Sequence, residues 1–284
     1  MSHFHTYHLQ RVLIVQNHLR KAPILPLEIL DHIFSFLDNE KPTFSTLKRC
    51  SEICDPNLRA AIDRHLYYHI HLNHNRDPLM SRDVTKFYEY LSRNRHAANY
   101  IRIVDISSRI AEGDSSWWHH QVSSILQMLT PSLEKITLSS HGDVIEPIVQ
   151  WSRFPETFRK AFIDCLWSPS IIEVSMGCIG GFPLSVFNPC SQLKRLSFFQ
   201  VDCTPSTSAQ FPPQIDSLVL SRSEDLATIV SWAKMGHHMC SLNFRLDQEV
   251  GFGLLIGLLD TYSDDLIELE LDLSKFPFMR EIYY

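Results

Sequence analysis

The chain has 284 residues, of which 44% are hydrophobic and 20% are charged, so its composition is that of a folded protein with one or two domains. The formal net charge is −6 and no run of Lys or Arg stands out, which argues against a nucleic-acid-binding surface. No stretch approaches the roughly 20 apolar residues of a membrane span, no signal-peptide core occurs, and the seven cysteines follow no disulfide pattern, so we expect a cytoplasmic or nuclear protein.

After an N-terminal extension, residues 1–21, the sequence predicts a small unit of three helices over residues 22–70. The first helix begins near Pro26, a residue that suits the first helical turn, and its apolar side chains cover about half of the circumference. The second helix spans about residues 43–54, and the third follows the break at Asp55-Pro56. Such a small unit buries little surface by itself. Its surplus apolar surface predicts a binding partner.

Apolar, cysteine and polar positions follow one another in a fixed order: Leu25-Pro26-x-Glu28-Ile29-Leu30-x-x-Ile33-x-x-x-Leu37, then Leu47-x-x-Cys50-Ser51-x-x-Cys54, then Arg64-His65-Leu66-Tyr67 and Ile70-x-Leu72. This ordered set of roughly 48 residues resembles an F-box, and it is especially similar to the F-box proteins abundant in mushroom-forming fungi. Asn57 departs from that family, because a Trp usually stands at about this position. Loss of an aromatic anchor would weaken partner binding.

The resemblance implies a non-enzymatic substrate adaptor of a Skp–cullin–F-box ubiquitin ligase, with an unknown protein as its target. It also implies which residues of the first two helices bind the Skp-type linker: Leu25, Pro26, Leu27, Ile29, Leu30, Ile33, Phe34, Leu47, Cys50, Ser51 and Cys54. Periodicity alone predicts a helical bundle in which these side chains are only core. The departure at Asn57 favours a second alternative, a protein-interaction scaffold that works without the ligase.

A pattern L-x-x-L-x-L, in which each L is a large apolar residue, recurs through residues 71–284. Its copies begin at Ile101, Leu133, Ile171, Leu193, Ile215, Met239 and Leu266, at intervals of 32, 38, 22, 22, 24 and 27 residues. The second half of each copy alternates as a half-buried strand does, and helix-like stretches lie between copies, at residues 82–93, 119–129, 156–166, 225–234 and 254–262.

These intervals predict an irregular leucine-rich-repeat-like α/β solenoid after the F-box, and the resemblance implies that this region binds the target. The alternative is an α/β domain with a doubly wound sheet. The apolar ending at residues 279–284 favours a shortened chain.

Candidate chemistry is sparse. His69, His71 and His74 form the best histidine cluster, and His69 and His71 share one face of a predicted strand, but only Asp63 and Asp77 lie near them in the sequence. We therefore expect a solvated edge strand without a metal, and a metal-dependent hydrolase is the rival hypothesis. No cofactor motif or catalytic motif occurs, and no enzymatic activity or cofactor is expected.

One aromatic pair, Trp117 and Trp118, precedes a predicted helix and follows a polar stretch. Exposed tryptophans often anchor interfaces, so this pair is a candidate for the target-binding surface. Burial between two neighbouring structural units is the alternative.

Overall fold

The computed structural model describes residues 63–65, 67–74, 78–108, 116–140, 149–205, 212–221, 226–236, 238–245 and 250–272. The chain divides into two compact units, Met1–Tyr68 and His69–Tyr284. In the first unit the described residues 63–65 and 67 are helical, and Asp63 is buried. The second unit is an α/β domain.

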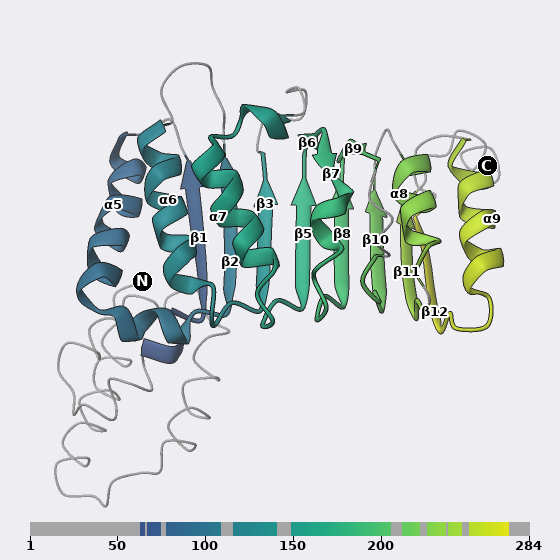
Figure 1. The fold of residues 1–284 in the computed structure, drawn as a ribbon, viewed down its shortest axis with the longest axis horizontal. Helices are drawn as coiled ribbons and strands as arrows, with labels where there is room; N and C mark the ends of the chain where they lie inside the picture. The colour runs from purple at the N-terminus through teal and green to yellow at the C-terminus, as the bar shows by residue number, and fades with distance from the viewer. Residues whose placement is uncertain are drawn as a thin grey trace, which may run out of the picture. The chain divides into compact units, whose positions relative to one another are not determined.

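An eight-stranded sheet forms the centre of the α/β domain (Figure 1). Every neighbouring pair of strands is parallel, and the order of the strands across the sheet follows the chain without a reversal. The strands are β1 (His69–His74), β2 (Ile103–Ser108), β3 (Lys135–Ser139), β5 (Glu173–Gly177), β8 (Arg195–Phe199), β10 (Ser217–Ser221), β11 (Ser241–Arg245) and β12 (Glu268–Asp272).

Helices connect many of these strands and lie along one side of the sheet (Figure 1). The α-helices are α5 (Pro78–Arg93), α6 (Ser116–Leu129), α7 (Glu156–Leu166), α8 (Leu226–Ala233) and α9 (Val250–Tyr262), and the 3-10 helices are η1 (Arg95–Tyr100), η2 (Trp151–Arg153) and η3 (Leu184–Phe187). Two small parallel pairs complete the domain, β4 (Val149–Gln150) with β6 (Ile179–Gly180) and β7 (Phe182–Pro183) with β9 (Cys203–Thr204).

Within the α/β domain, the predicted positions of strands and helices are confirmed. Each of the seven copies of the apolar pattern carries a strand of the sheet, and each predicted helical stretch lies at a helix. The expectation that the histidine-rich segment is an edge strand is also confirmed, because β1 occupies one end of the strand order.

The predicted fold class, an irregular leucine-rich-repeat-like solenoid, is wrong. The described residues form an α/β fold around one continuous parallel sheet, and their connections are unequal: α5 has 16 residues, α8 has 8, and a 3-10 helix of 4 residues lies between β5 and β8. The apolar pattern indicates only that one face of each strand is buried, so it does not distinguish a repeat from another α/β fold. That property is common to repeats and to α/β domains. Of the predicted three-helix F-box, the structure describes residues 63–65 and 67 of the third helix, which are helical, and the first two helices lie outside the described residues.

One face of the sheet forms the core. The inward side chains stand in rows across the strands, and one row runs Val104, Ile136, Val174, Leu196, Leu218 and Leu242, all at most 1% exposed. Because side chains alternate along a strand, the residues between them point to the opposite face, where they are partly or fully exposed.

Aromatic side chains continue the core beyond the sheet. Phe154, Phe158 and Phe162 lie on successive turns in and before α7, with stacked ring pairs 5.2 and 6.2 Å apart. Phe187 contacts the rings of Phe182, Phe198 and Trp232 at centroid distances of 5.4, 6.0 and 6.0 Å. Ring pairs at these distances add to the stabilisation from burial.

A repeated backbone arrangement holds the strands in register. The carbonyl oxygen of Arg102 accepts hydrogen bonds from the amides of Glu134 and Lys135, at 2.8 and 3.0 Å. The same two-to-one arrangement recurs at the start of each following strand, at the carbonyls of Glu134, Ile172, Lys194, Asp216 and Cys240. Each strand therefore starts level with its neighbour, and outward side chains with the same position in their strands lie side by side.

Candidate functional site

The outward face of the sheet is predominantly polar, and we call it the open face. It consists of the side chains that alternate with the buried ones on the main strands. In the middle of β3, β5 and β8 these are Thr137, Ser175 and Ser197, which the register places in one row. These short side chains extend only a little way from the sheet, so that a ligand or a partner can approach the backbone.

The open face is hollowed at the β1 end. The hollow has a volume of about 500 Å³ and is lined by side chains from β1, β2, β3 and β5, including Asn73, Ser107, Thr137 and Ser175. Its wall on one side is formed by His69, His71 and Asp105.

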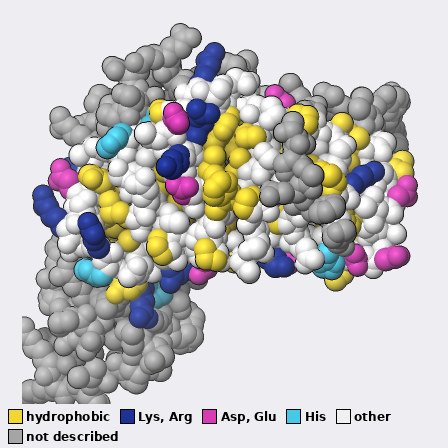
Figure 2. Space-filling model, viewed as in Figure 1, with side chains coloured by type: hydrophobic (Ala, Val, Ile, Leu, Met, Phe, Trp, Pro, Cys, Tyr) yellow, Lys and Arg dark blue, Asp and Glu magenta, His cyan; other side chains and the backbone are white. Residues whose placement is uncertain are grey.

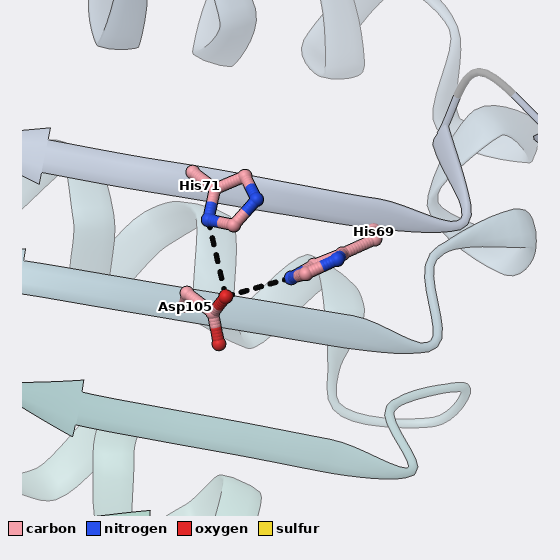
Figure 3. Close-up of side chains that lie close together, drawn as sticks. All are labelled: His69, His71 and Asp105. Carbon is pink, nitrogen blue, oxygen red and sulfur yellow. Dashed lines mark hydrogen bonds and ion pairs between the residues drawn. The ribbon is translucent and has the colours of Figure 1, made fainter. Parts of the chain in front are cut away.

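His69, His71 and Asp105 form a compact cluster (Figure 3). His69 and His71 alternate with Ile70 on β1, so both imidazoles lie on the open face, and the parallel register places His71 directly opposite Asp105 on β2. His69 Nε2 lies 2.7 Å and His71 Nδ1 lies 3.1 Å from the same carboxylate oxygen, Oδ2 of Asp105. The two imidazole rings are 4.2 Å apart between centroids. All three side chains remain accessible, with 40%, 67% and 29% exposure.

The carboxylate in this cluster was not anticipated from the sequence. Asp105 is 36 residues from His69, whereas the acidic residues near the histidines in the sequence are Asp63 and Asp77. Asp63 is buried in the other unit, and Asp77 and the side chain of His74 lie outside the described residues. A signal was present: aligning Ile70-His71-Leu72 with Val104-Asp105-Ile106 as parallel neighbours pairs His71 with Asp105.

A group of three charged side chains lies next to the cluster. Glu173 on β5 forms an ion pair with Lys135 on β3 through Oε1, and its Oε2 lies 3.4 Å from Nε of Arg195 on β8. The three residues occupy the same register position on adjacent strands. One carboxylate therefore serves two cations, so this group of three carries one excess positive charge.

The far end of the open face is acidic. β12 places Glu268, Glu270 and Asp272 outward, and each has a polar partner at the same level on β11. Ser241 donates a hydrogen bond of 3.1 Å to Glu268, Asn243 donates to Glu270, and Arg245 Nε lies 3.2 Å from Asp272 Oδ2. Only one of these three partners is a cation, so the end near β12 has negative excess charge.

A second cluster has the residue types of a nucleophilic site. Cys240 Sγ lies 3.0 Å from His238 Nε2, and His238 Nδ1 lies 3.6 Å from Asp265 Oδ2. Stabilising an oxyanion requires donors aimed at the reacting oxygen. Here the amides of Cys240 and Ser241 both donate to the carbonyl of Asp216. The geometry therefore fits a surface contact better than nucleophilic catalysis.

Burial makes the thiols of Cys165 and Cys190 unreactive. Burial raises the pKa of Cys165 to about 12, against a smaller opposite effect of its hydrogen bond with Thr130, and burial raises the pKa of Cys190 to about 12 as well. A thiol that stays protonated is neither a nucleophile nor a metal ligand. These two cysteines are packing residues.

The linker-binding residues predicted from the F-box resemblance all lie outside the described residues: Leu25, Pro26, Leu27, Ile29, Leu30, Ile33, Phe34, Leu47, Cys50, Ser51 and Cys54, together with Asn57. Trp117 and Trp118 lie in the first turn of α6, and their side chains are outside the described part of the structure.

Hydrophobic side chains gather in a band near the middle of the face that Figure 2 displays.

Comparison with models of known protein families and with curated proteins gives no match to this chain. Within the part of the chain that the structure describes, no helix is both long enough and apolar enough to cross a membrane.

Proposed function

We propose that the protein is a non-enzymatic adaptor that recruits a target protein to a Skp–cullin–F-box ubiquitin ligase. In this proposal residues 22–70 bind the Skp-type linker and the open face of the α/β domain binds the target. The observation that carries it is the presence, in one chain, of the ordered F-box-like residues and of a sheet with one accessible polar face.

The open face has properties that suit a protein target. It presents low serine and threonine side chains in its middle, a histidine cluster at the β1 end and an acidic row at the β12 end. Opposite charges on two surfaces steer their association and set their relative orientation. We therefore expect a target whose bound segment carries Lys or Arg where it meets β12.

Linker binding is tested by co-expressing the full chain with a Skp-type linker and measuring co-purification. In the predicted first helix, Leu30→Asp with Ile33→Asp places two charges on the apolar face, whereas His32→Asp with Ser35→Asp places them on the polar face. The first pair should reduce co-purification at least tenfold, since a buried unpaired charge is strongly unfavourable, and the second pair should leave it unchanged.

Circular dichroism of each purified variant establishes that the α/β domain is folded. A folded wild-type chain that does not bind the linker would remove the ligase from the proposal. The departure at Asn57 favours that outcome, and the protein would then be an interaction scaffold that acts through the open face alone.

Target binding is tested with Ser175→Arg plus Ser197→Arg, which raises the middle of the open face with two bulky cations. Thr157→Arg, at an exposed position of α7 away from that face, is the control. Ubiquitin-remnant proteomics identifies the proteins that are ubiquitinated in cells expressing each variant. The proteins that lose this modification with the open-face variant should be the same set as those that lose it with the variant Leu30→Asp plus Ile33→Asp. Retention of that set by a variant that still binds the linker would rule out the open face as the target surface.

A further inference from the structure

We propose that His69, His71 and Asp105 bind a divalent transition-metal ion of the zinc type on the open face. This inference does not depend on the adaptor function, because the three residues lie within the α/β domain and the linker is assigned to residues 22–70.

The distances suit a single ion. Each of the three residues offers one ligand atom, and these atoms all lie within 4.8 Å of one another. Ligand atoms about 2.0–2.2 Å from a tetrahedral zinc ion are separated from each other by about 3.3 Å. The separations from Asp105 Oδ2 to the two imidazole nitrogens, 2.7 Å and 3.1 Å, are somewhat shorter than that value, so the three side chains are already gathered at one point. An ion replaces these direct contacts, and the side chains that must rotate to admit it are exposed to solvent.

The ligand atoms also select the class of metal. Two imidazole nitrogens and one carboxylate oxygen suit Zn²⁺, Co²⁺, Ni²⁺ or Cu²⁺, whereas Mg²⁺ and Ca²⁺ prefer sets made of oxygen atoms. Three protein ligands leave a coordination position for water or for a group on a bound molecule. The exposure of the cluster, up to 67% for His71, makes that position accessible.

The surroundings of the cluster reduce both the loss of backbone entropy on metal binding and the electrostatic repulsion of the ion. The cluster is built on paired strands, His71 being in register with Asp105, so little backbone entropy is lost when the ion binds. Lys135 lines the same hollow and would repel a cation, but its ammonium group is paired with Glu173, a carboxylate that it shares with Arg195. That pairing weakens the repulsion.

The test uses the full chain without an affinity tag, with His3, His5 and His8 replaced by alanine to remove the other histidine-rich segment. After treatment with a chelator, Zn²⁺ is titrated in competition with a chromophoric chelator, and Co²⁺ binding is followed by visible absorption. We expect one Zn²⁺ per chain and no competition from millimolar Mg²⁺.

His71→Ala and Asp105→Asn should each weaken Zn²⁺ binding by more than the roughly 10–100-fold that loss of an outer-shell group causes. His120→Ala, which removes an exposed histidine of α6, should leave the affinity unchanged. Asp105→Asn keeps the size of the side chain, and thermal unfolding without metal shows whether each variant is folded. Zn²⁺ should raise the unfolding temperature of the parent and of His120→Ala only.

Equal Zn²⁺ affinity in the parent, His71→Ala and Asp105→Asn would overturn the inference. The same conclusion follows if the parent binds no Zn²⁺. The three side chains would then form only a hydrogen-bonded group that attaches the edge strand β1 to β2.

Discussion

His71 Nδ1 lies 3.1 Å from Oδ2 of Asp105, the residue that it faces across the parallel strands β1 and β2. A second imidazole, from His69, reaches the same oxygen at 2.7 Å. The pair joins the edge strand to the rest of the sheet at a point where both side chains are accessible to solvent. Its position on the open face links the candidate metal site to the surface that we assign to target binding.

Phe187 is expected to be critical for the stability of the domain. It is fully buried and contacts the rings of Phe182, Phe198 and Trp232, so Phe187→Ala removes a large side chain from a close-packed core. The expected loss in the free energy of unfolding is about 3–5 kcal/mol. Phe199→Ala, at a ring that is 39% exposed, is the matched control and should cost clearly less. Urea unfolding measures both, and equal losses would show that the aromatic cluster is not the core.

Two glycines should respond in opposite directions to alanine. A Cβ atom at Gly253, in α9, meets no atom within 4 Å, so Gly253→Ala should stabilise the protein by about 0.5–1 kcal/mol through the unfolded state. Gly181 has a φ of +64° and a Cβ there lies 3.0 Å from Gln150 Oε1, so Gly181→Ala should destabilise it. Thermal unfolding distinguishes the two, and a destabilised Gly253→Ala variant would contradict the helical assignment of this position.

Thiol labelling should follow burial. Cys165 and Cys190 are buried and their pKa values are raised to about 12, so the native protein should protect them from iodoacetamide. Cys240 is partly exposed and should react first of these three. Mass spectrometry of partly labelled protein gives the order, and early labelling of Cys190 in folded protein would contradict the packing around it.

The same thiols predict how stability depends on alkaline pH. An unfolded thiol loses its proton near its ordinary pKa of 9.0, whereas folded Cys190 keeps its proton up to about 12. Unfolding therefore releases a proton between these values, and stability that is present below pH 9 falls as the pH rises, by about 1.4 kcal/mol per pH unit for each thiol. Cys190→Ala should show a smaller fall between pH 9 and 10 in urea unfolding. An identical slope in both proteins would refute the assignment.

Glu173 should contribute a modest and salt-dependent stabilisation. Its carboxylate pairs with Lys135 and Arg195, and the side chain is 18% exposed. Glu173→Gln is expected to lower the free energy of unfolding by about 0.5–1 kcal/mol, and the difference should shrink in 1 M NaCl, where screening acts over about 3 Å. Glu89→Gln removes the exposed pair with Arg93 and should have a smaller effect. A loss at Glu173 that does not change with salt would indicate a packing effect instead.

The positions of the elements could be predicted from local sequence. The alternation of apolar and polar residues around Val104, Leu138 or Leu242 depends only on neighbouring residues, and it gave strands where the sheet has them. The helix-like stretches between the strands were likewise located from local sequence, although α5, α6 and α9 each begin three or four residues before the predicted stretch. The fold class was not predictable in this way, because a half-buried strand has the same pattern in a repeat and in an α/β domain.

The composition of the candidate site depended on tertiary structure. His69 and His71 could be placed on one face of a strand because a strand has a period of two residues. Strand periodicity does not identify their carboxylate partner, because Asp105 lies 36 residues from His69 and approaches it only where the two strands are parallel neighbours in this register. Register follows from backbone hydrogen bonds between distant segments, such as those at the carbonyl of Arg102. By itself, therefore, the sequence determined which side chains leave the core, and the pairing of the strands decided which of them meet.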